Sequence, residues 1–234
     1  MGKSYIDFLV GWEIHDPWSF YELAGCPGAL IVQISKLTQL AEQREIALSM
    51  EWLTFNEEPV WKIHKEISEW NDESFQLPDN TSKYEHLADA DAEELIHEQH
   101  DRYHCVEAWR YALLLYIERL FGTSGRQLRR LEITISARQI LDHVRCCRQS
   151  SQAQKQLLLP VFLAGSEAQD EEQRQFANAY CLFWEQKSRY GMFSSVPVLL
   201  NEIWSTGQWW GAVIDSKTRK PSMSKQGATQ LLFG

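Results

Sequence analysis

The chain has 234 residues, of which 44% are hydrophobic, and a chain of this length can bury about 70% of the surface that its unfolded form exposes. Its formal net charge of −9 disfavours direct binding to a nucleic-acid backbone. No apolar run approaches the roughly 20 residues that a membrane-spanning helix needs, and the N-terminus lacks a signal-peptide pattern. We therefore expect one globular domain with no membrane span.

Apolar residues recur at helical spacing in the first third of the chain. One stripe runs from Leu30 to Ala41, after a Pro-Gly pair, and a second runs from Val60 to Trp70. Residues 71–83 carry Pro, Asn, Asp, Ser and Thr, which is typical of a loop. The pattern predicts two amphipathic helices followed by a connection.

The middle of the chain predicts two longer helices. Residues 88–99 are acidic, and residues 106–120 then present an apolar face. A second apolar series runs from Leu128 to Val144, with Leu131 and Ile135 among its members. Residues 131–135 alternate as a strand would, but five residues are too few to outweigh the helical period around them.

Residues 157–165 form a nine-residue apolar run with Pro160 inside it. Proline removes a backbone donor and clashes with the carbonyl four residues earlier, here that of Gln156. The run therefore either begins a helix at Pro160 or contains a bend. Because it is too short to cross a bilayer, we expect it to be the packing centre of the domain.

The last third begins with a helix-start motif, in which Asp170 is followed three residues later by Gln173. Aromatic residues from 176 to 184 share a helical face, and residues 196–204 predict a short apolar helix. Residues 207–234 are less regular and are expected to form an irregular C-terminal tail. Strand patterns are sparse, so we predict an all-α fold, a single domain of about seven to nine helices.

Five cysteines are scattered along the chain, and no two have the C-x-x-C spacing. The odd number and the spacing argue against a disulfide framework and against a closed cysteine-rich zinc site. We expect free thiols in a reducing compartment.

Candidate chemistry is weak. His97, His100 and His104 fall on one helical face, where imidazoles can surround a metal ion, but a solvated polar face explains them better because no second ligand-bearing element is evident. Paired carboxylates sit in polar runs, and no glycine-rich phosphate loop or activated serine motif occurs. We predict no catalytic residue, no metal ligand and no cofactor in this chain.

Six aromatic residues could line an apolar ligand pocket, or could be part of a filled core, which is the commoner role of such residues. They are Phe162, Tyr180, Phe183, Trp184, Phe193 and Trp204.

Three blocks, in this order and spacing, resemble the fungal-specific transcription factor domain, the regulatory region of zinc binuclear-cluster transcription factors. They are residues 110–122, residues 157–168, which match the pattern L-L-x-P-x-F-x-A-G-x-E-A, and residues 196–204. The helix at residues 28–40 is similar to an early element of that domain, and the resemblance covers roughly residues 5 to 215. It is nearest to the subfamily of sterol-sensing regulators, although Leu159 stands where members often carry Trp.

The resemblance implies an all-α regulatory domain that controls transcription by binding an apolar small molecule or a protein partner. It also implies a nuclear location, with shuttling to the cytoplasm, and a homodimer. The six-cysteine zinc cluster of the family is missing from these residues, so zinc and DNA binding are expected only in a further domain. Two alternatives stay open: a ligand-free protein-interaction or dimerisation scaffold, and a helical metal-dependent enzyme.

Overall fold

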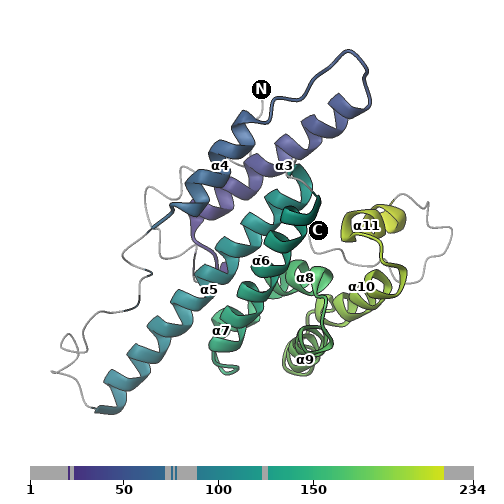
Figure 1. Ribbon diagram of the computed structural model, residues 1–234. Helices are drawn as coiled ribbons and strands as arrows, with labels where there is room; N and C mark the ends of the chain where they lie inside the picture. The colour runs from purple at the N-terminus through teal and green to yellow at the C-terminus, as the bar shows by residue number, and fades with distance from the viewer. Residues whose placement is uncertain are drawn as a thin grey trace.

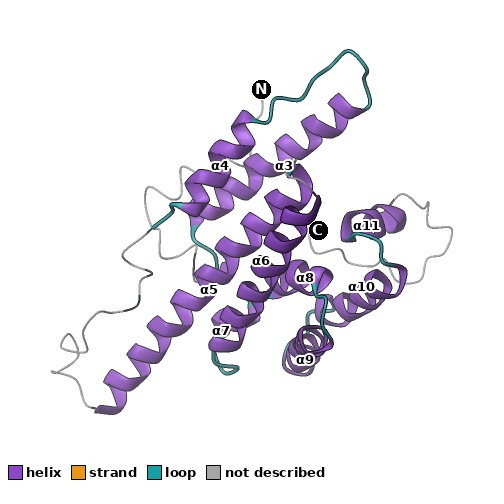
Figure 2. Cartoon of the chain, in the orientation of Figure 1, coloured by secondary structure: helices purple, strands orange, loops and turns teal. Residues whose placement is uncertain are grey.

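The computed structural model describes residues 21, 24–71, 75, 77, 89–122 and 126–218, and within them every regular element is helical (Figures 1 and 2). The predicted single all-α domain is confirmed. The helices are α3 (Gly28–Leu48), α4 (Glu58–Ser68), α5 (Asp89–Phe121), α6 (Arg126–Cys146), α7 (Gln152–Lys155), α8 (Leu158–Glu167), α9 (Glu171–Lys187), α10 (Met192–Thr206) and α11 (Trp210–Thr218).

Helix α5 is the spine of the fold. Its 33 residues span about 50 Å, and it packs against α3, α4, α6, α7 and α8. Figure 1 shows α3 and α4 along one end of this spine and α8 to α11 grouped on the other side of α6. Buried residues such as Val106, Leu113 and Ile117 follow helical spacing along α5, so its apolar stripe supplies much of the core.

Helix α8 is the packing centre, as the apolar run predicts. It contacts α5, α6, α9 and α10, and its side chains from Leu158 to Ala164 are buried except for Leu159, which is partly buried. Pro160 lies in the first helical turn, where a missing N–H leaves no intrahelical bond unmade. The first such bond runs from Val161 N to Leu157 O at 2.9 Å, so the proline begins the helix and does not bend it.

Gly165 lets three helices approach closely. A Cβ atom added there would lie 3.1 Å from the Cβ of Ala177 on α9 and 3.3 Å from both methyl groups of Leu200 on α10. Contacts this short are tighter than ordinary van der Waals packing, so the hydrogen side chain is required for the fit of α8 against its neighbours.

The start of α9 and the state of the cysteines are as the sequence predicts. Asp170 caps α9, because its Oδ1 accepts a hydrogen bond of 2.8 Å from Gln173 N. All five cysteines are free thiols; Cys146 is exposed and the other four are buried. No helix among the described residues is both long and apolar enough to cross a bilayer.

The structure has a helix, α6, over the second apolar series, but only part of that series is buried. Leu131 and Ile135 are 56% and 48% exposed, whereas Ile133 between them is buried. The expected irregular tail contains helix α11, which is anchored by buried Trp210 and Val213. Residues 219–234 of that tail, and most of the loop expected at 71–83, lie outside the described residues.

Candidate functional site

The six candidate pocket residues lie in three different places in the structure. Tyr180 and Trp184 of α9 pack against Phe193 of α10, with ring centroids 6.1 and 6.5 Å apart, and Phe183 lies edge-on to Trp184 at 5.2 Å. These rings fill the space between α9 and α10. Phe162, from α8, instead meets Trp210 of α11 at 6.4 Å.

Two of these aromatic residues also donate hydrogen bonds that hold α7 in place. The Tyr180 hydroxyl donates to the Gln154 carbonyl oxygen at 2.8 Å, and Trp184 Nε1 donates to Gln154 Oε1 at 3.1 Å. Gln154 is buried and donates in turn to the Cys147 carbonyl oxygen at 3.0 Å. Tyr180 and Trp184 therefore have a structural role in the core.

Trp204 lines a partly open cavity of about 480 Å³. The cavity sits where α5, α8 and α10 end and where α6, α9 and α11 begin. Its size is within the range of small-molecule pockets. Polar side chains outnumber apolar ones in its lining. Its charged and aromatic members are Arg119, Arg130, Glu167, Arg174, Trp204 and Trp209.

The arginines of this cavity have distinct partners. Arg119 Nε pairs with Glu167 Oε1 at 2.8 Å, and its guanidinium lies over the Trp209 ring. Arg174 Nε donates to the Ala168 carbonyl oxygen at 3.2 Å, and its guanidinium lies 5.3 Å from the centre of the Trp204 ring. Each tryptophan thus carries a cation over its ring, an arrangement that orders both side chains.

Trp204 is the one sequence candidate among the residues that line this cavity, and no sequence pattern indicates the others. Its residues come from six separate segments, and the arginines stand in ordinary polar patterns that predict solvated helix faces. Their convergence follows from the way helix ends meet around α8, and no local motif signals it.

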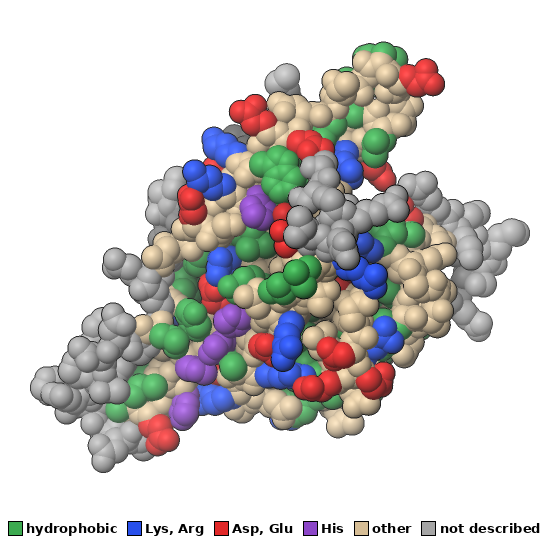
Figure 3. Space-filling view, viewed as in Figure 1, with side chains coloured by type: hydrophobic (Ala, Val, Ile, Leu, Met, Phe, Trp, Pro, Cys, Tyr) green, Lys and Arg blue, Asp and Glu red, His purple; other side chains and the backbone are tan. Residues whose placement is uncertain are grey.

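The histidines gather differently from the prediction. His104 lies between His100 and His143: its Nε2 is 3.2 Å from His100 Nε2, and its Nδ1 is 2.8 Å from His143 Nδ1. His97 instead faces Glu93 at 3.7 Å. Figure 3 shows histidine side chains in a row on this face of the molecule. The third member of the group, His143, comes from α6 and could not be found from spacing along one helix.

These three imidazoles form a hydrogen-bonded chain that suits neutral rings. A neutral imidazole has one donor and one acceptor, so His104 can donate to one neighbour and accept from the other. Burial lowers the pKa of His104 to about 4, with the charges of His100 and His143 acting in the same direction. Burial also lowers the pKa of His143. Among the described residues, no group of three or more His, Cys, Asp or Glu side chains could hold a metal ion.

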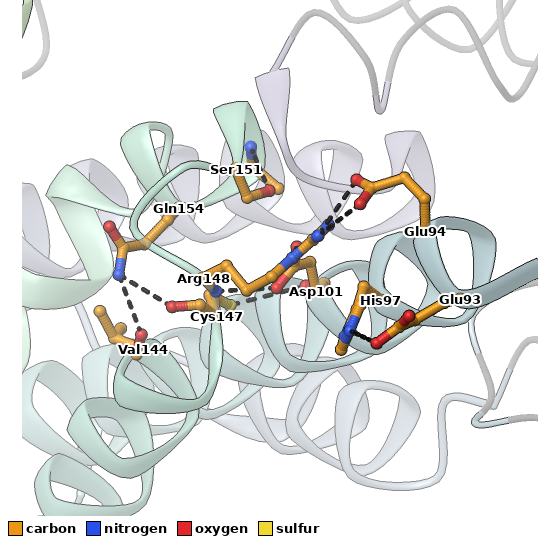
Figure 4. A network of polar contacts seen from close by, with 10 residues as sticks. Glu93, Glu94, His97, Asp101, Val144, Cys147, Arg148, Ser151 and Gln154 are labelled. Atoms are coloured by element: carbon orange, nitrogen blue, oxygen red, sulfur yellow. Dashed lines mark hydrogen bonds and ion pairs between the residues drawn. The ribbon is translucent and has the colours of Figure 1, made fainter. Parts of the chain in front are cut away.

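A second polar network fixes the end of α6 to α5 (Figure 4). Asp101 is only 2% exposed, and its carboxylate accepts from Arg148 Nε at 2.7 Å and from Arg148 N at 2.8 Å. Arg148 also donates to both oxygens of Glu94 at 3.0 Å. Because every group here is satisfied by another protein group, the network is structural.

Comparison with known proteins assigns the class of this helical domain. Residues 11–210 match the fungal specific transcription factor domain, so the chain belongs to that family, as the three sequence blocks predict. The match is to the family as a whole, and the sterol-sensing subfamily stays a prediction. No curated protein and no solved structure matches the chain.

Proposed function

We propose that this chain is the effector-sensing domain of a fungal transcription factor, which acts in the nucleus through a DNA-binding region outside these residues. The observation that carries the proposal is the family match over residues 11–210, which supports a regulatory role. The effector is a small molecule with an apolar body or a protein partner. No enzymatic role is proposed, and the histidine chain is assigned to structure.

The cavity beside Trp204 supports sensing because of its place between helix ends. A ligand shifts a conformational equilibrium only when it binds one state more tightly than the other. Occupancy of this cavity would alter how α10 and α11 sit against α8. Helix α11 responds most readily in this proposal, since it is short and its main anchor is Trp210, stacked on Tyr116 at 5.9 Å and edge-on to Phe162.

A reporter fusion tests the regulatory role. The 234-residue chain is joined to an unrelated DNA-binding domain, and transcription from its operator is compared with that of the DNA-binding domain alone. We expect the fusion to change transcription in at least one growth condition. A matched fusion that carries Gly165→Trp, which cannot fit between α8, α9 and α10, should lose the effect. Equal transcription from all three proteins in every condition would contradict the proposal.

The scaffold alternative is favoured by one surface. The end of α3 and the loop after it form a tip, at the upper right of Figures 1 and 3, with five exposed apolar side chains. Leu48 and Trp52 are 75% and 79% exposed, and Ile46, Met50 and Leu53 lie beside them in sequence. Exposed clusters of this kind commonly mark protein interfaces. The partner proposed for the tip is a second copy of the chain.

Sedimentation of the purified chain tests this dimer. The double variant Leu48→Ser with Trp52→Ser should shift the protein to monomer at concentrations where the parent chain is dimeric. Val198→Ser removes an apolar side chain that is 63% exposed on α10 and serves as the control. A monomeric parent chain, or a dimer that the double variant leaves intact, would count against the tip as the interface.

A further inference from the structure

The cavity beside Trp204 has the opposite charge to the rest of the chain. Three arginines and one glutamate line it, whereas the whole protein has a formal net charge of −9. Positive groups gathered in a concave site focus the electrostatic potential and attract anions there, even on an acidic protein. The net positive charge of the cavity lining therefore favours a negatively charged ligand.

Two of the three arginines keep their charge available. Arg119 is neutralised by Glu167 at 2.8 Å. Arg130 contacts the neutral side chain of Gln169 at 3.4 Å, and Arg174 contacts the Ala168 carbonyl oxygen. Within the part of the chain that the structure describes, no carboxylate lies within ion-pair distance of Arg130 or Arg174. A guanidinium offers five N–H donors in a fixed plane, which suits the paired oxygens of a carboxylate or phosphate.

The rest of the lining combines polar side chains with apolar ones, and the apolar ones include the planar rings of Trp204 and Trp209. The Trp204 ring is held by its own hydrogen bond, in which Nε1 donates to the Gly165 carbonyl oxygen at 2.9 Å. Trp209, from the loop after α10, also lines the cavity, and the buried side chains of Ile133, Ala168 and Ile203 add to the apolar surface. A flat hydrophobic body can pack against indole rings, since aromatic surfaces bury large areas in defined orientations.

We propose that this cavity binds a small organic oxyanion, with a carboxylate or phosphate head between Arg130 and Arg174 and a planar apolar body against Trp204 and Trp209. The proposal rests on the proposed function only in treating this ligand as the effector; the binding itself is independent of transcription. It refines the expected apolar effector by adding a charged head, because a wholly apolar molecule would leave both guanidinium groups without an anionic partner.

Calorimetric titration of the full 234-residue chain tests the site with three probes of similar shape. Naphthalene-1-acetate carries a carboxylate, 1-naphthyl phosphate carries a phosphate, and naphthalene-1-acetamide is neutral. We expect one molecule of an anionic probe to bind per chain with a Kd about tenfold or more below that of the amide, which corresponds to the loss of one charge-assisted hydrogen bond. The tighter of the two anions identifies the head group. Binding of the amide with the same Kd as both anions would overturn the proposal.

Three variants locate the binding. Arg174→Gln and Arg130→Gln should each raise the Kd of the anionic probe about tenfold. Arg189→Gln removes the same charge from an exposed position outside the cavity and should leave this Kd unchanged. Circular dichroism checks that each variant is folded. If Arg174→Gln unfolds, the Kd of Arg130→Gln tests the site, because Arg130 is exposed and its replacement should not disturb the fold. Unchanged binding by Arg130→Gln, or equal weakening by Arg189→Gln, would refute the site. A reporter fusion whose transcription does not change when the probe is bound would refute the ligand's role as the effector and would leave the binding site intact.

Discussion

The indole Nε1–H of Trp204 donates to the carbonyl oxygen of Gly165 over 2.9 Å. This bond joins the end of α10 to the end of α8, two segments that are 39 residues apart in sequence. Two of the blocks by which the sequence resembles its family, residues 157–168 and residues 196–204, therefore meet at one point. Trp204 also lines the arginine-lined cavity, so one side chain takes part in helix packing and in the proposed ligand site.

Replacing Trp204 with Phe removes the donor and keeps most of the ring. We expect a loss of about 1 kcal/mol in the free energy of unfolding, the usual contribution of one hydrogen bond, because Ala168 N still reaches the Gly165 oxygen at 3.2 Å. Urea denaturation measures it. Trp52→Phe, at an exposed position, is the matched control and should change stability by less than half as much. Equal effects of the two substitutions would mean that the Trp204 bond contributes nothing.

Gly165→Ala places a methyl group into the contact between α8, α9 and α10. We expect a loss of about 1 to 2 kcal/mol, since overpacking of a close contact outweighs the gain of roughly 1 kcal/mol in helix propensity. Thermal unfolding checks this. Gly191→Ala is the control, because a Cβ atom there meets nothing within 4 Å. A Gly165→Ala variant as stable as the parent would show that the helices can separate without cost.

Much of the fold follows from local patterns in the sequence. The stripe from Leu30 to Ala41, the series in α5 and the run around Pro160 each have the period and end signals of a helix, and the structure has helices there. The buried face of α6 does not follow from its sequence, because Leu131, Ile133 and Ile135 are all apolar and only tertiary packing decides which of them is buried. Helix α11 was missed because its anchor, Trp210, is stabilised by residues of α5 and α8 that lie far away in sequence.

The candidate site was harder to predict, for a physical reason. Aromatic spacing identifies side chains that cluster, but it cannot distinguish a packed core from a core with a cavity. Tyr180, Trp184 and Phe193 pack directly against one another. The arginines of the cavity are individually unremarkable in sequence. The positive charge of the cavity depends on how close these arginines lie to one another, and the distances between their helices are set only when the helices pack.

Asp101→Asn tests the buried ion pair in Figure 4. The amide would still accept a hydrogen bond from Arg148 N, but it leaves the Arg148 guanidinium without its buried counter-charge. We expect a loss of about 3 kcal/mol in the free energy of unfolding, at the low end for a broken buried pair because Arg148 keeps Glu94. Glu94→Gln changes the exposed partner of the same arginine and should cost clearly less. If both variants lose the same stability, burial of Asp101 does not govern the pair.

The histidine chain predicts that stability falls in mild acid. Burial lowers the pKa of His104 to about 4, so the folded state leaves this ring neutral at a pH where the unfolded chain, with an ordinary imidazole pKa of about 6.5, binds a proton. The unfolded state then holds more protons, and stability decreases as pH falls from about 6.5 towards 4 and is unaffected by this group above that range. Asp101 and Glu107 oppose the shift at His104, and Arg110 adds to the lowered pKa of His143.

Urea denaturation between pH 7.5 and 4.5 measures this dependence, and His104→Gln should make it shallower, because the group with the lowered pKa is gone. His97→Gln is the control on the same helix: His97 pairs with Glu93 and stands outside the imidazole chain, so its loss should leave the slope in place. Protonation of His104 would also require both neighbouring rings to accept hydrogen bonds from it, which breaks the donor order of the neutral chain. A slope that is the same in His104→Gln and in the parent chain would show that these rings do not couple folding to pH.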